Sequence, residues 1–203
     1  IWPEYGVYEP MWAHVYDSTV TFLEGNAGSQ PIGHLAEPRI EPEILLHFKR
    51  APAGARTEAE ILDCIDWIAH SVEVVQSHFP DWTFKAPDTA AAFGLHGALL
   101  VGPRRPVAEL DALVEKLRTF TIALSRNGEV RARGGGANVL DSPLLAFAHL
   151  QRLLEGLPQF EPVQAGEIVS TGTLTAALPI QAGETWSTEF SGLELDGLRV
   201  QFK

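Results

Sequence analysis

"IEPEILLHF" (residues 40–48) is an apolar, strand-like stretch that contains two carboxylates. Successive side chains of a strand point to opposite faces, so Glu41 and Glu43 would point the same way, a few ångströms apart. Two like charges this close, in apolar surroundings, are costly unless a cation lies between them. The stretch therefore predicts a buried strand with a cation site on one face.

A third acid, Glu73, stands alone among valines in "SVEVVQS" (71–77). Three acids in apolar contexts on predicted strands indicate one pocket, and an oxygen-only site suits a hard divalent cation, Mg²⁺ or Mn²⁺. Three carboxylates leave about three of an octahedron's six positions for water or substrate. The alternative is that the glutamate pair, with Pro42, protects an exposed sheet edge from further pairing.

The segment "TEAEILDCIDWIAH" (57–70) predicts a helix. Thr57 and Glu60 form a capping-box pattern at its start, and an apolar stripe continues through Ile61, Ile65 and Ile68. The β-branched residues of 71–77 then predict a strand. Continuation of the helix through Ser77 is the alternative.

Glycine and proline punctuate the rest of the chain at the short intervals typical of strands. Further strands are expected at 15–22, 38–48, 96–102, 166–175, 183–190 and 197–203, with a hairpin over 118–133 that turns at Asn127-Gly128. A partly helical segment is expected at 106–117, a glycine-rich loop at 134–138 and an irregular stretch at 79–95. A helix is expected at 141–156, with Asp141 as its N-cap and Gly156 near its C-cap. The pattern predicts one α+β domain over residues 1–203.

Composition narrows the classes of function. The net charge of -11 argues against a nucleic-acid-binding protein, because no basic stripe is available to neutralise phosphates. The sequence contains no run of about 18 apolar residues, so we expect no membrane span. The single cysteine, Cys64, can form neither an internal disulfide nor a cysteine-based metal site, which favours a reducing compartment such as the cytoplasm.

The first residues, "IWPEYGVYEPMW" (1–12), have no Met start, basic segment or apolar core of a signal peptide. They begin abruptly in material that already reads as structured. We therefore expect residues upstream of this sequence to be missing from it.

In order and spacing, several segments resemble the fumarylacetoacetate hydrolase superfamily, in its 2-keto-4-pentenoate hydratase / 4-oxalocrotonate decarboxylase branch. They are "PRIEPEI" (38–44), "SVEVVQS" (71–77), "DTAAA" (88–92), "LSRNGEV" (124–130), "VLDSPLLAFAHLQRLL" (139–154) and "GEIVSTGTLTAALPIQAGETW" (166–186). The opening "PEYGVYEPMW" (3–12) is similar to a Pro-Asp-Tyr-Gly segment of that branch, with Glu4 in place of Asp. The resemblance covers nearly the whole chain.

The resemblance implies a mixed β-roll, or pseudo-barrel, flanked by helices, with Glu41, Glu43 and Glu73 as ligands of Mg²⁺ or Mn²⁺. It implies a metal-dependent lyase, a hydratase of a 2-hydroxy-dienoate or 2-oxo acid in aromatic catabolism, in which the cation stabilises an enolate. Decarboxylation of an oxo-acid and C–C hydrolysis of an acylpyruvate are alternatives, as is a homologue that binds metal and 2-oxo acid without catalysis. Family members commonly form homo-oligomers.

The same resemblance suggests other site residues. Gly172 and Thr173 would lie near the substrate carboxylate, Lys85 could face the anionic substrate, and Glu4 could orient a water. His96 and His78 stand where the family has other residues and could act as acid–base groups. The competing interpretations are that the Thr173 hydroxyl is bonded to backbone, that Lys85 is a solvated surface lysine, and that His96 and His78 are structural. A structural role is also expected for the other histidines His34, His47, His70 and His149.

Two features depart from the family pattern. The loop reads "DTAAAF" (88–93), so Ala92 and Phe93 replace an Asp-Asn pair, which predicts a more apolar or differently shaped pocket. The family also has a lysine in a segment upstream of the Pro-Asp-Tyr-Gly region, and this sequence starts after that point.

Overall fold

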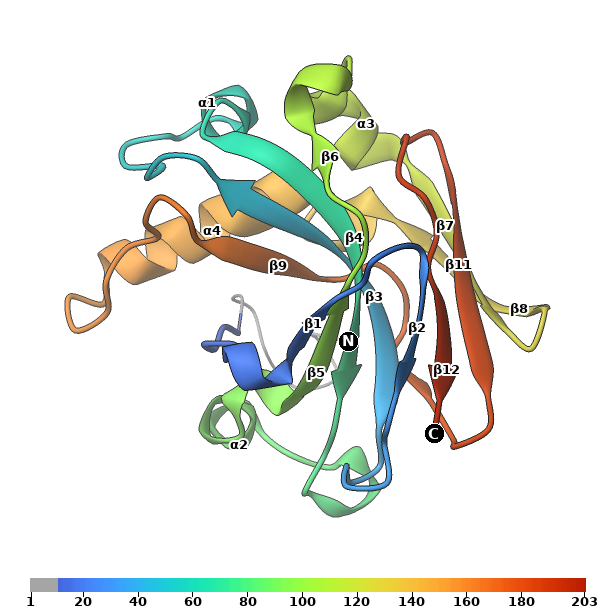
Figure 1. Ribbon diagram of the computed structural model, residues 1–203. Helices are drawn as coiled ribbons and strands as arrows, with labels where there is room; N and C mark the ends of the chain where they lie inside the picture. The colour runs from blue at the N-terminus through green and yellow to red at the C-terminus, as the bar shows by residue number, and fades with distance from the viewer. Residues whose placement is uncertain (1–10) are drawn as a thin grey trace.

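The computed structural model describes residues 11–203, which form two β-sheets and four α-helices (Figure 1). The larger sheet has seven strands in the order β1-β5-β4-β3-β10, with β6 also paired to β4 and β9 to β3. Its strands are β1 (Val20–Phe22), β3 (Arg39–Phe48), β4 (Ile65–Val75), β5 (His96–Val101), β6 (Arg105–Pro106), β9 (Ile168–Thr173) and β10 (Leu178–Pro179).

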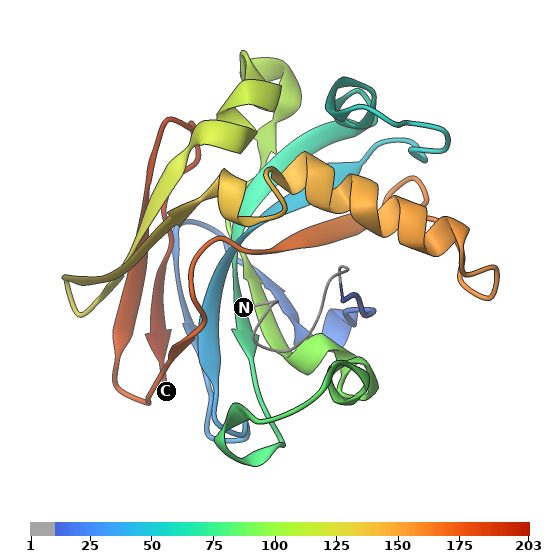
Figure 2. The ribbon, with the colours of Figure 1, turned by 180° about the vertical axis from the view of Figure 1, so that it is seen from behind.

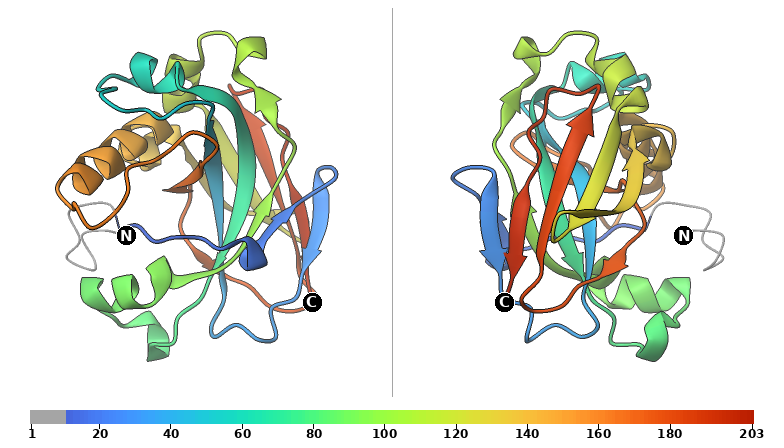
Figure 3. Two further views of the ribbon diagram at one scale, coloured as in Figure 1. Left: turned by 60° about the vertical axis from the view of Figure 1, so that its left-hand side comes forward. Right: turned by 90° about the vertical axis from the view of Figure 1, so that its right-hand side faces the viewer.

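The smaller sheet has five strands in the order β2-β12-β11-β7-β8 (Figure 3, right). They are β2 (Ala27–Gln30), β7 (Thr121–Arg126), β8 (Glu129–Gly135), β11 (Thr185–Ser191) and β12 (Arg199–Phe202). The predicted hairpin is confirmed: β7 and β8 pair, and Asn127 and Gly128 both have positive φ, 51° and 85°, as a tight hairpin turn requires. The two sheets are not closed into a barrel, and the α+β class is confirmed.

The helices are α1 (Glu58–Leu62), α2 (Ala86–Ala91), α3 (Leu113–Thr119) and α4 (Pro143–Glu155). Figure 2 shows α4 lying across the larger sheet along β9. None of the helices within residues 11–203 is long and apolar enough to cross a bilayer.

Two apolar cores occupy one face of β3. Ile44, Leu46 and Phe48 are fully buried in the core beneath the helices, where the rings of Phe48 and Phe147 lie 4.5 Å apart. Ile40, on the same face, belongs to a second core that the strands of the smaller sheet complete. The opposite face carries the odd-numbered residues of β3. These include Glu41 and Glu43, and also Leu45, which packs in a separate small cluster with Ala69, Leu99 and Val101.

Strand β3 lies inside the sheet, between β4 on one side and β9 and β10 on the other. The edge-strand interpretation of Pro42 is therefore wrong. The carbonyl of Pro42 accepts a hydrogen bond from the Leu174 N–H (2.8 Å), on the β9 side. Since N and C=O of one strand residue point to the same side, the missing N–H of Pro42 leaves the ladder with β4 intact.

The predicted helix over 57–70 is wrong beyond its first turns. Its capping box is present, because Thr57 Oγ1 accepts from the Glu60 N–H and the Glu60 carboxylate accepts from the Thr57 N–H. The helix ends at Leu62, and Ile65 already pairs with Phe48 as the start of β4. Strand β4 is buried on both faces over most of its length. The sequence of such a strand is largely apolar and cannot be told from a buried helix by its periodicity. The strand expected over 71–77 is confirmed through Val75, and the helical alternative is wrong.

Other expected elements are shorter or displaced. The strand expected at 15–22 contains a 3-10 turn, Asp17–Thr19, before β1 begins. The irregular stretch 79–95 contains α2 and two 3-10 turns, and the helix within 106–117 begins only at Leu113. The glycine-rich segment 134–138 begins as the end of β8 and continues as a 3-10 turn. The short strands β2, β6 and β10 lie outside the ranges in which strands were expected.

The N-cap of α4 is Ser142 rather than the expected Asp141. The buried Ser142 Oγ accepts a hydrogen bond from the Leu144 N–H (3.2 Å), whereas Asp141 has a left-handed φ of 71° and is exposed. Gly156 is confirmed as the C-cap.

Replacing the capping hydroxyl tests this assignment. Ser142→Ala should lower the free energy of unfolding by about 1 kcal/mol, because the Leu144 N–H loses its partner. Asp141→Asn, which keeps the tolerance for a left-handed backbone, should change it by less than about 0.5 kcal/mol. Urea unfolding of both variants measures the two values. Equal losses would contradict the assignment.

His70 connects the two sheets behind the glutamates. Its Nδ1 lies 3.0 Å from the carbonyl oxygen of Glu43, and its Nε2 lies 2.8 Å from Thr188 Oγ1 on β11. Burial lowers the pKa of His70 to about 4, so the ring is neutral at pH 7. The Nδ1–H therefore donates to Glu43, and Nε2 accepts the Thr188 hydroxyl proton, whose oxygen in turn accepts from the Leu198 N–H (2.8 Å).

The neutral ring makes stability depend on pH. The pKa of His70 is lower in the folded chain (about 4) than its ordinary value of 6.5, so the unfolded chain binds more protons between these values. Stability should fall as pH drops from 6.5 to 4, with a contribution from His70 on the order of 3 kcal/mol. Urea unfolding at several pH values should show this loss reduced in His70→Asn. An unchanged pH dependence in the variant would contradict the bridge.

Candidate metal centre

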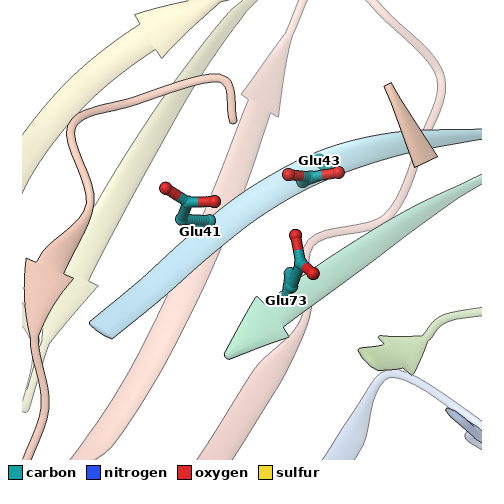
Figure 4. A group of neighbouring side chains, drawn as sticks. All are labelled: Glu41, Glu43 and Glu73. Atoms are coloured by element: carbon teal, nitrogen blue, oxygen red, sulfur yellow. The ribbon is translucent and has the colours of Figure 1, made fainter. Parts of the chain in front are cut away.

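Three glutamates meet on the face of the larger sheet that is turned away from both cores. Glu41 on β3 lies directly opposite Glu73 on β4, and Glu43 lies two residues further along β3 on the same face. One carboxylate oxygen of each lies within 4.8 Å of the others (Figure 4). The structure thus brings together the three acids that the sequence singled out.

The cluster is electrostatically strained without a cation. Burial, together with the charge of Glu73, raises the pKa of Glu41 to about 8, although Arg39 works in the opposite direction. Glu43 is only 2% exposed, and burial and the two neighbouring carboxylates raise its pKa well above the ordinary value. Part of the cluster therefore retains protons at neutral pH in the absence of a cation.

One oxygen of Glu43 is fixed by β9. Ser170 Oγ donates to Glu43 Oε2 at 2.5 Å, and the Gly172 N–H donates to the same oxygen at 3.0 Å. These contacts depend on a bulge, because Glu43 pairs with Thr173 while Leu45 pairs with Ser170. Gly172 has a φ of 106° at this bulge, a conformation that favours glycine.

Glu73 is also held from one side. The Nδ1 of His96, the first residue of β5, lies 2.6 Å from Glu73 Oε1. Within residues 11–203 no hydrogen bond reaches the carboxylate of Glu41, and none reaches Glu43 Oε1 or Glu73 Oε2. Among the contacts of residues 11–203, each acid thus keeps at least one oxygen without a protein partner.

The arrangement fits a hard divalent cation. All the available donors are carboxylate oxygens, the ligand type that Mg²⁺ and Mn²⁺ prefer. Ser71 lies opposite Glu43 across β3 and β4 and is fully buried, and its hydroxyl has no hydrogen-bond partner among the described residues. A cation with its own water ligands would neutralise the acids and could bring a partner to such a hydroxyl.

The other residues singled out in the sequence are placed as follows. The Gly172 N–H donates to the Glu43 carboxylate. Thr173 is the strand partner of Glu43, and its hydroxyl donates to the carbonyl of Thr175 (2.9 Å). Lys85 and His78 are exposed, and neither has a hydrogen bond or ion pair with the three acids in the described part of the chain. Glu4 lies outside the described residues.

The altered loop also lies on the surface. Ala92 packs beside the buried cluster of Val75, Trp82 and Leu95, while Phe93 is 56% exposed and its ring lies 6.2 Å from that of Tyr16.

Three residues beside the acids were not singled out by the sequence. Ser170 reaches Glu43 only because of the bulge in β9, and Thr19 reaches His96 from a turn 77 residues earlier. Ser71 could have been found, because it lies two residues before Glu73 and therefore on the same face of the predicted strand.

The chain matches known proteins over most of its length. Residues 14–198 match the family model described as fumarylacetoacetate (FAA) hydrolase C-terminal. A 2-keto-4-pentenoate hydratase of Burkholderia vietnamiensis is 31% identical over 189 residues, which are 93% of this chain and 69% of that protein. A 4-oxalocrotonate decarboxylase of Pseudomonas sp. (strain CF600) is 30% identical over 190 residues, 93% of this chain and 68% of that protein.

A solved structure shares the fold. The 4-oxalocrotonate decarboxylase of Pseudomonas putida G7, complexed with magnesium and adipate, superposes with a TM-score of 0.86 at 27% identity, covering 99% of this chain and 73% of that one. A second structure of that decarboxylase, complexed with calcium and acetate, has a TM-score of 0.83. By sequence and by fold, the chain belongs to the fumarylacetoacetate hydrolase C-terminal family.

Proposed function

We propose that this chain is a divalent-metal-dependent lyase that hydrates a 2-hydroxy-dienoate or the related 2-oxo acid in the breakdown of aromatic compounds. The observation that carries this proposal is the convergence of three glutamates on one face of β3 and β4. The relatives named 2-keto-4-pentenoate hydratase, at 29–31% identity, support the reaction class.

We further propose Glu41, Glu43 and Glu73 as the protein ligands and Mg²⁺ or Mn²⁺ as the ion. The magnesium in the solved decarboxylase of Pseudomonas putida G7 supports a divalent cation in this family. When bound, such a cation stabilises negative charge on the keto oxygen of a 2-oxo acid.

The chain's own residues prepare the site for this chemistry. Ser170 and the Gly172 N–H fix one oxygen of Glu43 and leave the other for the ion. Behind the strand, His70 fixes the Glu43 carbonyl and so the backbone that aims the side chain. Gly172 and Thr173 lie next to Glu43 and are proposed to contact the carboxylate of the substrate.

The remaining assignments from the sequence stay predictions. They are Lys85 as a contact for the anionic substrate, Glu4 as a residue that orients a water, His78 as an acid–base group, a single domain over residues 1–203, assembly into a homo-oligomer, and a location in the cytoplasm.

Decarboxylation of an oxo-diacid is the second candidate. Relatives named 4-oxalocrotonate decarboxylase reach 30% identity, and the solved decarboxylase shares the fold over 99% of this chain. Both reactions require stabilisation of the same enolate charge, so the cation site alone is compatible with either.

The raised pKa of Glu41 makes cation binding depend on pH. In the folded, cation-free chain this pKa is about 8 instead of 4.5, so the stabilising contribution of protonated Glu41 is complete below pH 4.5 and is lost as pH rises through 8. A cation must displace this proton. Mg²⁺ should therefore raise the Tm more at pH 8 than at pH 6 and release protons on binding. Thermal scans and calorimetry in buffers of different ionisation enthalpy measure both effects; a larger Tm rise at pH 6 would contradict them.

Removing one charge tests the ligand set. Glu43→Gln should abolish Mg²⁺ binding and activity while the fold stays intact, because the amide offers the ion no negative charge. Glu189→Gln, an exposed glutamate on β11, is the matched control and should behave as the unaltered chain. Calorimetric titration with Mg²⁺ reports binding, and circular dichroism reports the fold. Unchanged Mg²⁺ affinity in Glu43→Gln would rule out the assignment.

The reaction is tested with two substrates. A hydratase should consume the absorbance of 2-hydroxypenta-2,4-dienoate only when Mg²⁺ is present, with uptake of water and no release of CO₂. Release of CO₂ from 4-oxalocrotonate, without loss of the dienoate, would favour the decarboxylase. Binding of oxalate with turnover of neither substrate would favour a non-catalytic homologue.

A further inference from the structure

His96 is clamped between Glu73 and a residue from a distant part of the chain. Its side chain is only 7% exposed. The Nδ1 atom lies 2.6 Å from Glu73 Oε1, and Nε2 lies 2.8 Å from Thr19 Oγ1. Both ring nitrogens are therefore engaged, and neither is directed to solvent.

Thr19 is itself fixed. It ends the 3-10 turn Asp17–Thr19, and both its N–H (3.0 Å) and its hydroxyl (2.9 Å) lie within hydrogen-bond distance of the Tyr16 carbonyl. The next residue, Val20, begins β1, which pairs in parallel with β5, the strand that starts at His96. Two adjacent strands thus determine where the imidazole lies.

The donor and acceptor capacities of the two side chains determine the direction of the hydrogen bond between His96 and Glu73. A carboxylate that binds a cation is ionised and only accepts, so in that state Nδ1 carries the proton that faces Glu73 Oε1. With that proton on Nδ1, Nε2 of the neutral ring accepts the Thr19 hydroxyl proton, whereas Nε2–H of a protonated ring donates to the hydroxyl oxygen. The His96–Glu73 contact is then a donor from a fixed ring to one chosen oxygen.

The second oxygen of Glu73 is not bonded to His96. Figure 4 shows one oxygen of this carboxylate pointing toward Glu41 and Glu43 and the other turned away. We propose that His96, anchored by Thr19, is a positioning residue that occupies one oxygen of Glu73 and so makes this acid a one-oxygen ligand of the cation. This inference rests on the proposed function, because it assumes that the cation binds at Glu41, Glu43 and Glu73.

The geometry distinguishes this role from direct acid–base catalysis. A general base needs a ring nitrogen within reach of the substrate, and both nitrogens of His96 already have protein partners. Glu43 is held in a similar way, since Ser170 and Gly172 both donate to its Oε2. Partners of this kind typically change metal affinity about 10- to 100-fold when they are lost.

Four variants test the inference by Mn²⁺ binding. His96→Leu removes both hydrogen bonds at similar volume. His96→Asn restores a donor near the position of Nδ1, and Thr19→Val removes only the anchoring hydroxyl. His47→Leu is the matched control, because His47 also pairs with a carboxylate, Asp66, on the same face of β3 but away from the cluster. Thermal unfolding without metal establishes that each variant is folded.

Titration followed by electron paramagnetic resonance gives the affinities. His96→Leu should weaken Mn²⁺ binding at least about tenfold, His96→Asn should stay within about threefold of the unaltered chain, and Thr19→Val should lie between them. His47→Leu should bind as the unaltered chain does. Water-proton relaxation should also show one fewer bound water on Mn²⁺ in His96→Leu, because the freed Glu73 can then bind with both oxygens.

Two results would overturn the positioning role alone: Mn²⁺ binding by His96→Leu as tight as in the unaltered chain, or folded His96→Asn binding as weakly as His96→Leu. Absence of Mn²⁺ binding by the unaltered chain would instead overturn the proposed function, and this inference with it.

Discussion

Repulsion among three partly buried carboxylates is the constraint on which the site depends. Two charges 4.8 Å apart repel each other by about 3 kcal/mol at an effective dielectric constant of about 20. The fold nevertheless holds Glu41, Glu43 and Glu73 on rigid strands, where they cannot move apart. Protons relieve part of this repulsion in the cation-free chain, and a divalent cation relieves it more completely. The proposed site would therefore accept an ion without rearrangement of the strands.

The surrounding structure serves to keep the acids in place. The cores fill the opposite face of β3 and β4, so the odd-numbered side chains have one direction left to point. His70 ties the Glu43 backbone to the smaller sheet, the bulge in β9 fixes one oxygen of Glu43, and His96 fixes one oxygen of Glu73. The second sheet and β1, far from the acids in sequence, thus contribute to the site through hydrogen bonds.

The sequence predicted the parts of this arrangement that are local. Alternation along β3 placed Glu41 and Glu43 on one face, and turn chemistry located the hairpin at Asn127-Gly128. Predictions from the sequence failed where pairing between distant segments determines the secondary structure or the contact. The apolar period around Ile65 fitted a helix until β3 was available as a partner, and the contact between Thr19 and His96 joins residues 77 positions apart. A bulge such as that at Gly172 depends on the register of two strands, which no single segment encodes.

The proposed function requires the three glutamates to share one divalent cation. A crystal structure of the chain soaked with Mn²⁺ and oxalate, with anomalous diffraction at the manganese edge, would locate this ion. We expect one anomalous peak bounded by Glu41, Glu43 and Glu73, within coordination distance of one oxygen of each, with oxalate on the remaining positions. Manganese bound elsewhere, with these carboxylates still bonded only to protein groups, would contradict it.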